Sequence, residues 1–202
     1  MALPPHHELV ERLARALPAR SRAVLELDGV RRAAVAVLLV NRGGITHVPF
    51  TVRSSALVEH AGQVSLPGGR PSPEDASLTE TALRETFEEL GVPPASLRVL
   101  GPFDDVVTST GYAITPVIAA AMSPPSYLAN PAEVAEVFEV PLSLFGDPAA
   151  AELLGTRDFR GIRYPMRSYS FEGRRIWGAT ARVLETLLGG LRSEMVLEEE
   201  DR

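Results

Sequence analysis

The sequence predicts an α/β (α+β) fold, in which helices pack on the faces of a mixed β-sheet. Apolar residues repeat at helical spacing in residues 7–17 and again in residues 175–188. Between these segments, β-rich runs bounded by turn residues recur without the regular strand and helix alternation of a parallel sheet. The 202 residues, 45% of them hydrophobic, predict one domain with a core at residues 31–188 and an acidic, solvated tail at residues 194–202.

The predicted strands are set apart by turn signals. The Asn-Arg-Gly-Gly run at residues 41–44 separates two β-rich runs and therefore predicts a hairpin. The Thr-Ser-Thr-Gly run at residues 108–111 joins two later runs in the same way. The predicted strands are residues 31–40, 46–54, 97–107 and 112–121, with a further short hairpin at residues 160–171.

Composition and charge exclude several classes of function. A formal net charge of -6 argues against binding to a nucleic-acid backbone, which needs a basic patch or stripe. The absence of cysteine excludes disulfides, thiolate zinc sites and a cysteine nucleophile. The chain has no signal-peptide pattern and no apolar run long enough to span a bilayer, so we expect a cytoplasmic protein that does not contact membranes.

The middle of the chain predicts a helix at residues 74–90. Ser72 is expected to cap its start, with Pro73 at the first helical position, and Gly91 to end it. Asp75 is expected to return a capping hydrogen bond rather than to bind a metal. The helix thus begins directly after a glycine- and proline-rich stretch, residues 67–73.

Side chains on this helix divide into two groups. Three apolar residues recur at i, i+4 and i+7 and are expected to face the core: Leu83, Phe87 and Leu90. Three carboxylates occur at i, i+3 and i+4 and are expected on roughly the opposite side: Glu85, Glu88 and Glu89.

The three carboxylates allow two interpretations. Acidic runs on helices are often simply solvated, and like charges at i, i+4 cost only about 0.2–0.5 kcal/mol. Alternatively, they bind a divalent cation, which takes oxygen ligands. Two neighbouring features favour the cation: the turn at Gly68 and Gly69 can bring a backbone carbonyl to it, and Arg84 can brace the carboxylates.

This pattern resembles the signature of the Nudix hydrolases. In that family a glycine, a short loop and an acidic residue precede a helix with an Arg-Glu and Glu-Glu pattern, followed by a glycine and an aliphatic residue. The acidic loop position falls on Glu74 or Asp75. Phe87 matches the family's bulky residue one position late, with Thr86 in its usual place, and the other matching residues are Gly69, Arg84, Glu85, Glu88, Glu89, Gly91 and Val92.

The resemblance implies a Nudix-type α/β/α sandwich with a mixed β-sheet and a loop–helix–loop catalytic motif. It implies that Arg84, Glu85, Glu88 and Glu89 form a catalytic cluster, which uses Mg²⁺ or Mn²⁺ to cut a phosphoanhydride bond in a nucleoside diphosphate derivative. Glu85 and Glu89 would be the principal metal ligands. Glu88 would bind directly or through water, and the carbonyl of Gly69 would complete the set.

The preceding segment is similar to the extra motif of the coenzyme A pyrophosphatases, a Nudix branch that splits CoA into 3′,5′-ADP and 4′-phosphopantetheine. Val58 stands where that branch has an arginine, and Leu66 where it has a phenylalanine. Later matches at residues 110–117, 137–142 and 176–178 extend the resemblance over most of residues 31–188. The residues that carry it in the motif are Thr51, Arg53, Ser54, His60, Gly62, Gln63, Pro67, Gly68 and Gly69.

The resemblance gives substrate-binding expectations for Arg53, His60 and Gln63. Because the 3′-phosphate of CoA needs a local cation, we consider Arg53, His60 and Arg70, and expect Arg53 to pair with it. Without the resemblance, Arg53 would be interpreted as a surface charge and His60 as a loop-packing residue.

Several alternatives stay open from the sequence. The general base is Glu88, Glu133 or Glu136, and the last two could equally lie on an ordinary helix surface. Trp177 is expected in the core. The substrate is CoA or a derivative, or another dinucleotide such as ADP-ribose or NADH, and a nucleotide-sensing module without activity is the alternative of another class. The sequence does not predict an oligomeric state.

Overall fold

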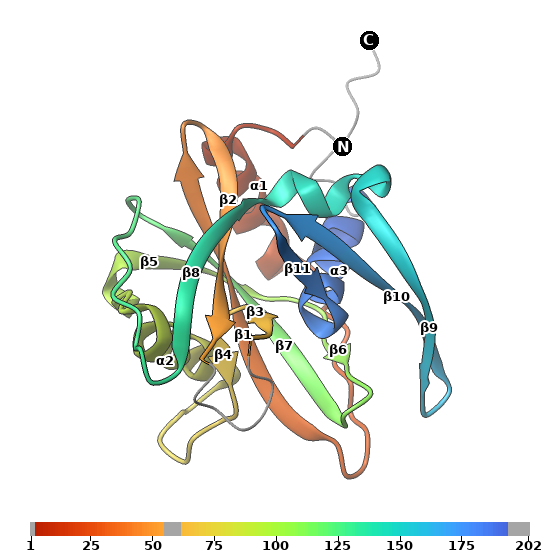
Figure 1. The fold of residues 1–202 in the computed structure, drawn as a ribbon. Coiled ribbons are helices and arrows are strands. Elements are labelled where there is room, and N and C mark those ends of the chain that lie inside the picture. Colours follow the sequence, from red (N-terminus) through yellow and green to blue (C-terminus); the bar gives the residue numbers. More distant parts are fainter. Residues whose placement is uncertain (1–2, 55–61, 194–202) are drawn as a thin grey trace.

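Strand β1 (Arg31–Arg42) lies at the centre of the main sheet in the computed structural model, which describes residues 3–54 and 62–193 (Figure 1). It pairs in parallel with β7 (Tyr112–Ala121) and antiparallel with β2 (Ile45–Arg53) and β4 (Gly68–Gly69). The sheet is therefore mixed, which confirms the predicted fold class. Its other strands are β3 (Val64–Ser65), β5 (Leu97–Pro102), β6 (Val106–Val107) and β8 (Val134–Pro141).

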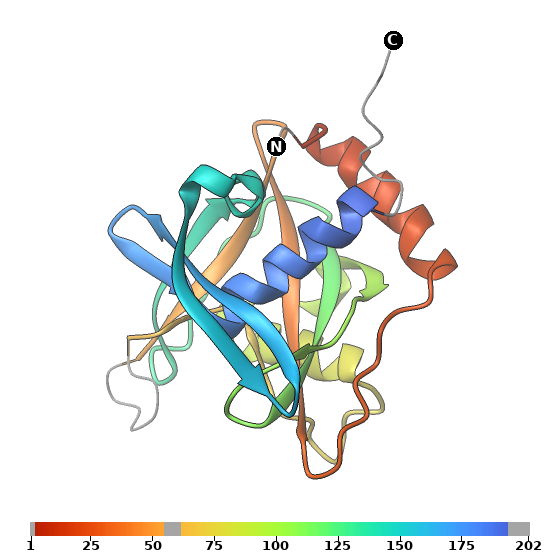
Figure 2. The ribbon, with the colours of Figure 1, turned by 90° about the vertical axis from the view of Figure 1, so that its right-hand side faces the viewer.

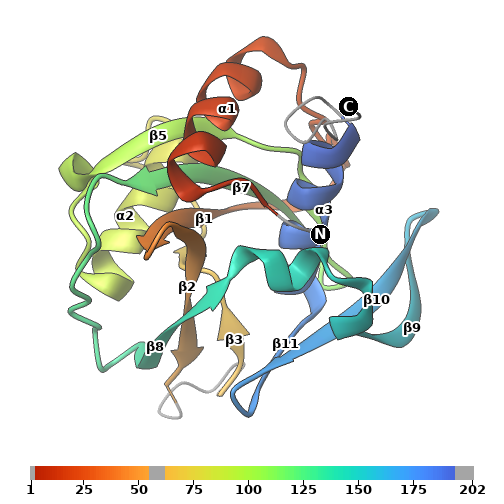
Figure 3. The ribbon, with the colours of Figure 1, turned by 90° about the horizontal axis from the view of Figure 1, so that it is seen from above.

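A second sheet has the order β11-β10-β9 and extends away from the main sheet (Figure 3). It consists of β9 (Ala151–Phe159), β10 (Ile162–Phe171) and β11 (Arg174–Trp177). The hairpin predicted at residues 160–171 was wrong in extent, because this range holds only the turn and one strand. No side chain of β9 is fully buried. Its sequence therefore has no alternation of apolar and polar residues from which a strand could be predicted.

The helices cover both faces of the main sheet. The described part of the chain has α1 (His6–Ala19), α2 (Leu78–Leu90) and α3 (Gly178–Ser193), with short 3₁₀ turns at Pro94–Ser96, Leu142–Gly146 and Pro148–Ala150. The first of these helices confirms the prediction at residues 7–17. The last begins three residues later than predicted, because residues 174–177 pair with β10 as a strand.

Strand β1 shows how the layers are built. Its side chains alternate between two faces, as in any strand. Val37 and Leu39 pack with α1 and α3, while Ala34 and Ala36 face Ala82 of α2. Figure 2 shows α3 crossing one face of the sheet. The arrangement is the α/β/α sandwich that the sequence predicted, and small alanines let α2 lie close to the strand.

The described residues also bear on the expectation that no helix spans a membrane. Within residues 3–54 and 62–193, none of the helices has the length and the apolar character that crossing a membrane would require. His60, Val58 and the acidic tail at residues 194–202 lie outside the described residues.

Candidate active site

Helix α2 begins later than the sequence predicted. Its cap is Ser77, which lies at the extended φ and ψ of a cap and accepts a hydrogen bond from the backbone N–H of Glu80. The Ser72 cap was therefore wrong. Ser72 instead donates its N–H to the carboxylate of Asp75 at 2.8 Å, which closes a turn before the helix. Gly91 ends the helix in the left-handed conformation, as expected.

The predicted orientation of α2 was right for Leu90, which is fully buried, and for Leu83, which packs against the core, but it was wrong for Phe87 and Glu89. Phe87 is 52% exposed, whereas Glu89 is only 6% exposed. The face turned toward the sheet consists of Thr81, Ala82, Thr86, Glu89 and Leu90. Two threonines and an alanine make a narrow surface that fits the alanine-rich strand, and the bulky Phe87 would not fit there. Of the three carboxylates, Glu89 is therefore buried, Glu85 is half-buried and Glu88 is exposed.

Glu89 is a buried carboxylate with incomplete hydrogen bonding. The backbone N–H of Gly68 bonds to it, but its Oε2 atom has no hydrogen-bond partner among the described residues. Burial raises the pKa of Glu89 to about 8, and the nearby charges of Glu85 and Glu133 add to the increase. A buried polar atom without a partner costs free energy, which calls for an explanation other than stability.

Glu85 lies against the glycine that the sequence singled out. A Cβ atom at Gly69 would collide with the Glu85 carboxylate, so only glycine leaves this carboxylate its place. Burial raises the pKa of Glu85, although the hydrogen bond from Arg84 opposes the increase. The Gly69 backbone and the Glu85 carboxylate thus lie together, as the sequence predicted.

Arg84 joins the helix to the loop before it. Its Nε and Nη2 atoms donate to the two oxygens of Asp75, each at 3.0 Å, and its Nη1 atom donates to Glu85 and Glu88, each at 2.9 Å. The pKa of Asp75 is well below its usual range, chiefly because of these bonds from Arg84. Asp75 therefore anchors Arg84, and the exposed Glu88 is held through the same guanidinium.

The donor set fits a divalent cation through two carboxylates rather than three. Within the described residues, no three histidine, aspartate or glutamate side chains come together as a ready-made metal cage. Mg²⁺ often binds proteins through only one or two carboxylates and keeps several waters. Glu85 and Glu89, with the neighbouring Gly69 backbone, provide such a set, and the unbonded Oε2 atom of Glu89 is a free acceptor within the described residues.

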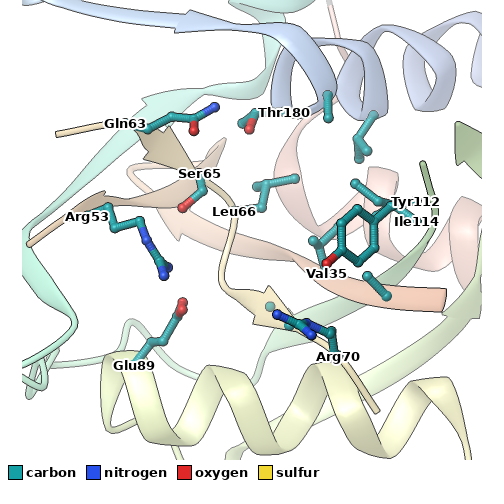
Figure 4. Close-up of a pocket in the computed structure, with 15 residues that line it drawn as sticks. Val35, Arg53, Gln63, Ser65, Leu66, Arg70, Glu89, Tyr112, Ile114 and Thr180 are labelled. Atoms are coloured by element: carbon teal, nitrogen blue, oxygen red, sulfur yellow. The ribbon is translucent and has the colours of Figure 1, made fainter. Parts of the chain in front are cut away.

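A cavity of about 290 Å³ opens beside Glu89 (Figure 4). Arg53 and Gln63, both predicted to bind substrate, line it, and the backbone N–H of Arg53 bonds to the carbonyl of Gln63 at 2.9 Å. The positive charge of Arg53 lowers the pKa of Glu89, so the two side chains are electrostatically coupled. Trp177, expected in the core, is 40% exposed and lies on β11.

The structure separates two candidates for the general base. Neither lies on a helix, because Glu133 is in a turn and Glu136 is on β8. The charge of Glu133 raises the pKa of both Glu85 and Glu89. Glu136 instead pairs with Arg174, with 3.2 Å between Oε2 and Nε. Glu133 therefore lies near the two carboxylates, whereas Glu136 forms an ion pair with Arg174.

Some lining residues were not expected from the sequence. Ser65, Tyr112, Ile114, Thr180 and Val183 all line the cavity, although they come from three separate parts of the chain. The sequence marks Tyr112 only as part of the match at residues 110–117, and no local sequence feature indicates that the others line a cavity. The parallel pairing of β1 with β7 and the position of α3 bring them together, and neither can be deduced from sequence spacing.

Comparisons with known proteins agree with this geometry. The chain matches the family model described as the NUDIX domain over residues 30–154. Two relatives are both named uncharacterized Nudix hydrolase NudL. The one from Photorhabdus laumondii is 38% identical over 162 residues, which cover 79% of this chain and 84% of the relative. The one from Yersinia pestis is 35% identical over 159 residues, which cover 78% of each.

A solved structure gives a separate likeness in fold. A MutT/nudix family protein from Enterococcus faecalis has a TM-score of 0.50 and a sequence identity of 16%, over 85% of this chain and 66% of the other. At this level of identity the likeness concerns the fold alone.

Proposed function

Because this chain belongs to the Nudix hydrolase family, we propose that it hydrolyses the diphosphate bond of coenzyme A or of a CoA derivative, with Mg²⁺ or Mn²⁺ as cofactor. The products are 3′,5′-ADP and 4′-phosphopantetheine. The observation that carries the hydrolase assignment is the buried, incompletely bonded Glu89 at the edge of a cavity. The CoA refinement rests on the motif from Thr51 to Gly69, of which Arg53 and Gln63 line that cavity.

Three protein groups would hold the cation: Glu85, Glu89 and the backbone carbonyl of Gly69. Glu88 would bind through water, and Arg84 would set the positions of Glu85 and Glu88 through its hydrogen bonds of 2.9 Å to each. A divalent ion bound there polarises phosphoryl oxygens and lowers the pKa of bound water. Arg84 itself is anchored by Asp75, which keeps the guanidinium from turning toward the substrate.

Two further residues have roles in the proposed reaction. Glu133 accepts the proton of the attacking water, because it is the remaining carboxylate coupled to both Glu85 and Glu89. Arg53 pairs with the diphosphate, since its charge is coupled to Glu89 and a guanidinium binds phosphate oxygens through two hydrogen bonds. The cation and Arg53 together would offset the substrate charge next to an acidic cluster.

Product analysis over a substrate panel tests the proposal. The purified protein is incubated with CoA, dephospho-CoA, ADP-ribose and NADH, each with Mg²⁺ and with Mn²⁺, and the products are separated and identified. We expect 3′,5′-ADP from CoA at the highest kcat/KM. Preferred cleavage of ADP-ribose or NADH would replace the CoA assignment and keep the hydrolase. Binding of these compounds without any cleavage would instead indicate a nucleotide-sensing module.

A further inference from the structure

The cavity has two chemically different ends. Arg53 and Glu89 lie together at one end, and Tyr112, Ile114 and Arg70 at the other (Figure 4). The proposed function places the diphosphate at the first end, beside the metal-binding carboxylates. The second end has no role in that proposal and lies where one half of the substrate would extend.

The second end is built from neighbouring side chains of the sheet. Ala33 and Ile114 are paired residues of β1 and β7, and Arg31 and Tyr112 are the pair two residues before them. The guanidinium of Arg31 lies 4.1 Å from the centroid of the Tyr112 ring. This contact fixes an aromatic ring beside apolar side chains, and a flat heterocycle can stack on such a surface.

Arg70 supplies a positive charge at the same end. Its backbone carbonyl accepts a hydrogen bond from Arg84 at 3.1 Å, which ties the Arg70 main chain to the catalytic helix. Its guanidinium has no hydrogen bond, ion pair or ring contact within residues 3–54 and 62–193, although it lines the cavity. The donors of this side chain are therefore available to an anionic group of a bound ligand.

We propose that the second end binds the nucleotide half of the substrate, with the base against Tyr112 and with Arg70 paired to the phosphate on the ribose. This inference rests on the proposed function, and it moves recognition of the 3′-phosphate from Arg53 to Arg70. The Tyr112 ring and the Arg70 guanidinium both fit the nucleotide half of CoA, which carries a base and a 3′-phosphate. A pantetheine arm offers neither an aromatic ring nor a second anionic group.

The size of the cavity agrees with binding of one half. Ligand pockets that enclose a whole drug-sized molecule measure about 300–1,000 Å³. At about 290 Å³ the cavity lies at the lower limit, whereas CoA is larger than a typical drug. The cavity therefore encloses one part of the substrate, and the pantetheine half extends beyond it.

Binding of the product 3′,5′-ADP (adenosine 3′,5′-bisphosphate) and of 5′-AMP, which lacks the 3′-phosphate, tests the inference without any turnover. Calorimetric titration compares adenosine 3′,5′-bisphosphate with 5′-AMP in the wild type, in Arg70→Ala and in Arg163→Ala. The last variant removes an exposed arginine of β10, outside the cavity, and controls for net charge. We expect the wild type and Arg163→Ala to prefer the bisphosphate about tenfold, and Arg70→Ala to lose most of that preference.

Turnover gives a second measurement on the same variants. Arg70→Ala should lower kcat/KM about tenfold for CoA and less than about twofold for dephospho-CoA, whereas Arg53→Ala should lower both equally. Equal losses for the two substrates in Arg70→Ala, or an unchanged preference for the bisphosphate, would overturn the inference. An Arg70-dependent preference for the bisphosphate in a protein that does not cleave CoA would support the inference and refute the proposed function.

Discussion

The position of Glu89 is unfavourable for the stability of the fold. It is 6% exposed, lies near two other carboxylates, and has one oxygen without a hydrogen-bond partner among the described residues. A buried charge of this kind is unfavourable unless it is paired or binds a metal. Strongly perturbed carboxylates beside a cavity are typical of functional sites.

Replacing Glu89 with glutamine distinguishes an effect on activity from an effect on the stability of the fold. Glu89→Gln keeps the size of the side chain and removes its charge, so we expect kcat/KM to fall by at least about 100-fold, or about 2.7 kcal/mol of transition-state stabilisation. The melting temperature should stay the same or rise, because glutamine fills the buried site without the cost of ionising a carboxyl group there. Turnover near that of the wild type at saturating Mg²⁺ would refute the metal assignment. The exposed Glu26→Gln is the control.

Gly69 allows a second test at the same scale. A Cβ atom there would collide with the Glu85 carboxylate, so Gly69→Ala must displace a proposed ligand without changing its identity. We expect the apparent affinity for Mg²⁺, measured by titration of activity, to fall about 10–100-fold. Gly43→Ala is a useful comparison for stability only, since its Cβ would meet no neighbour but its φ is positive. An unchanged Mg²⁺ dependence in Gly69→Ala would show that Glu85 does not bind the metal.

At the scale of elements, the orientation of α2 depends on the size of its side chains as well as on their hydrophobicity. Its threonines and its alanine face the sheet, and the larger Phe87 points away from it. The i, i+4 and i+7 spacing predicted that Phe87 faces the core, because this pattern depends only on which residues are apolar. It contains no information on the distance between the helix and the strand. This orientation is also what buries Glu89, one position before the buried Leu90.

The orientation predicts unequal effects of two truncations on the same helix. Leu90 is fully buried, so Leu90→Ala should lower the free energy of unfolding by about 2–5 kcal/mol. Phe87 is 52% exposed, so Phe87→Ala should change the free energy of unfolding by less than about 1 kcal/mol. Urea unfolding of both variants gives the comparison. A large loss in Phe87→Ala would mean that another surface covers this side chain.

The segment between α1 and β1 is attached to the sheet through Asp105. This buried carboxylate accepts hydrogen bonds from Thr115, Arg32, Arg22 and the backbone N–H of Leu25, at 2.6–2.9 Å. Burial alone would raise the pKa of Asp105, but these bonds outweigh it and hold the pKa below 3.8. The connection therefore depends on the ionised form.

This connection predicts how stability depends on pH. Because the pKa of Asp105 is lower in the folded protein than in the unfolded chain, its contribution is present above pH 3.8 and is lost as the pH falls through the folded value. At neutral pH, Asp105→Asn should therefore be less stable than the wild type, and the difference should shrink below pH 3.8. Urea unfolding at pH 7 and pH 3 measures both, with the exposed Asp28→Asn as control. A difference that does not depend on pH would refute this account.

At the scale of the whole molecule, the site is a product of topology. The cavity takes residues from β1, β2, β3, β4, α2, β7 and α3. The parallel pair of β1 and β7 sets Tyr112 and Ile114 beside β1, while the opposite face of the same strand carries α2. Helix α2 and the cavity are thus positioned by one central strand.

The sequence alone determined the features that depend on local order. The strand at residues 112–121, the turn after β1 and the end of α2 at Gly91 follow from β-rich runs, turn residues and capping, which act between near neighbours. The cluster of Arg84, Glu85, Glu88 and Glu89 was found in the same way, since its residues lie within two turns of one helix. The pattern also gave the family, which the comparisons confirm.

Only the tertiary structure decided which of these residues face one another. It buried Glu89 and exposed Phe87, brought Glu133 to the cluster while pairing Glu136 with Arg174, and placed Arg70 at the opposite end of the cavity from Arg53. Each outcome depends on the distance between elements and on the register of strands far apart in the chain. Hydrophobic spacing and motif order contain neither quantity, because both arise only when the layers pack.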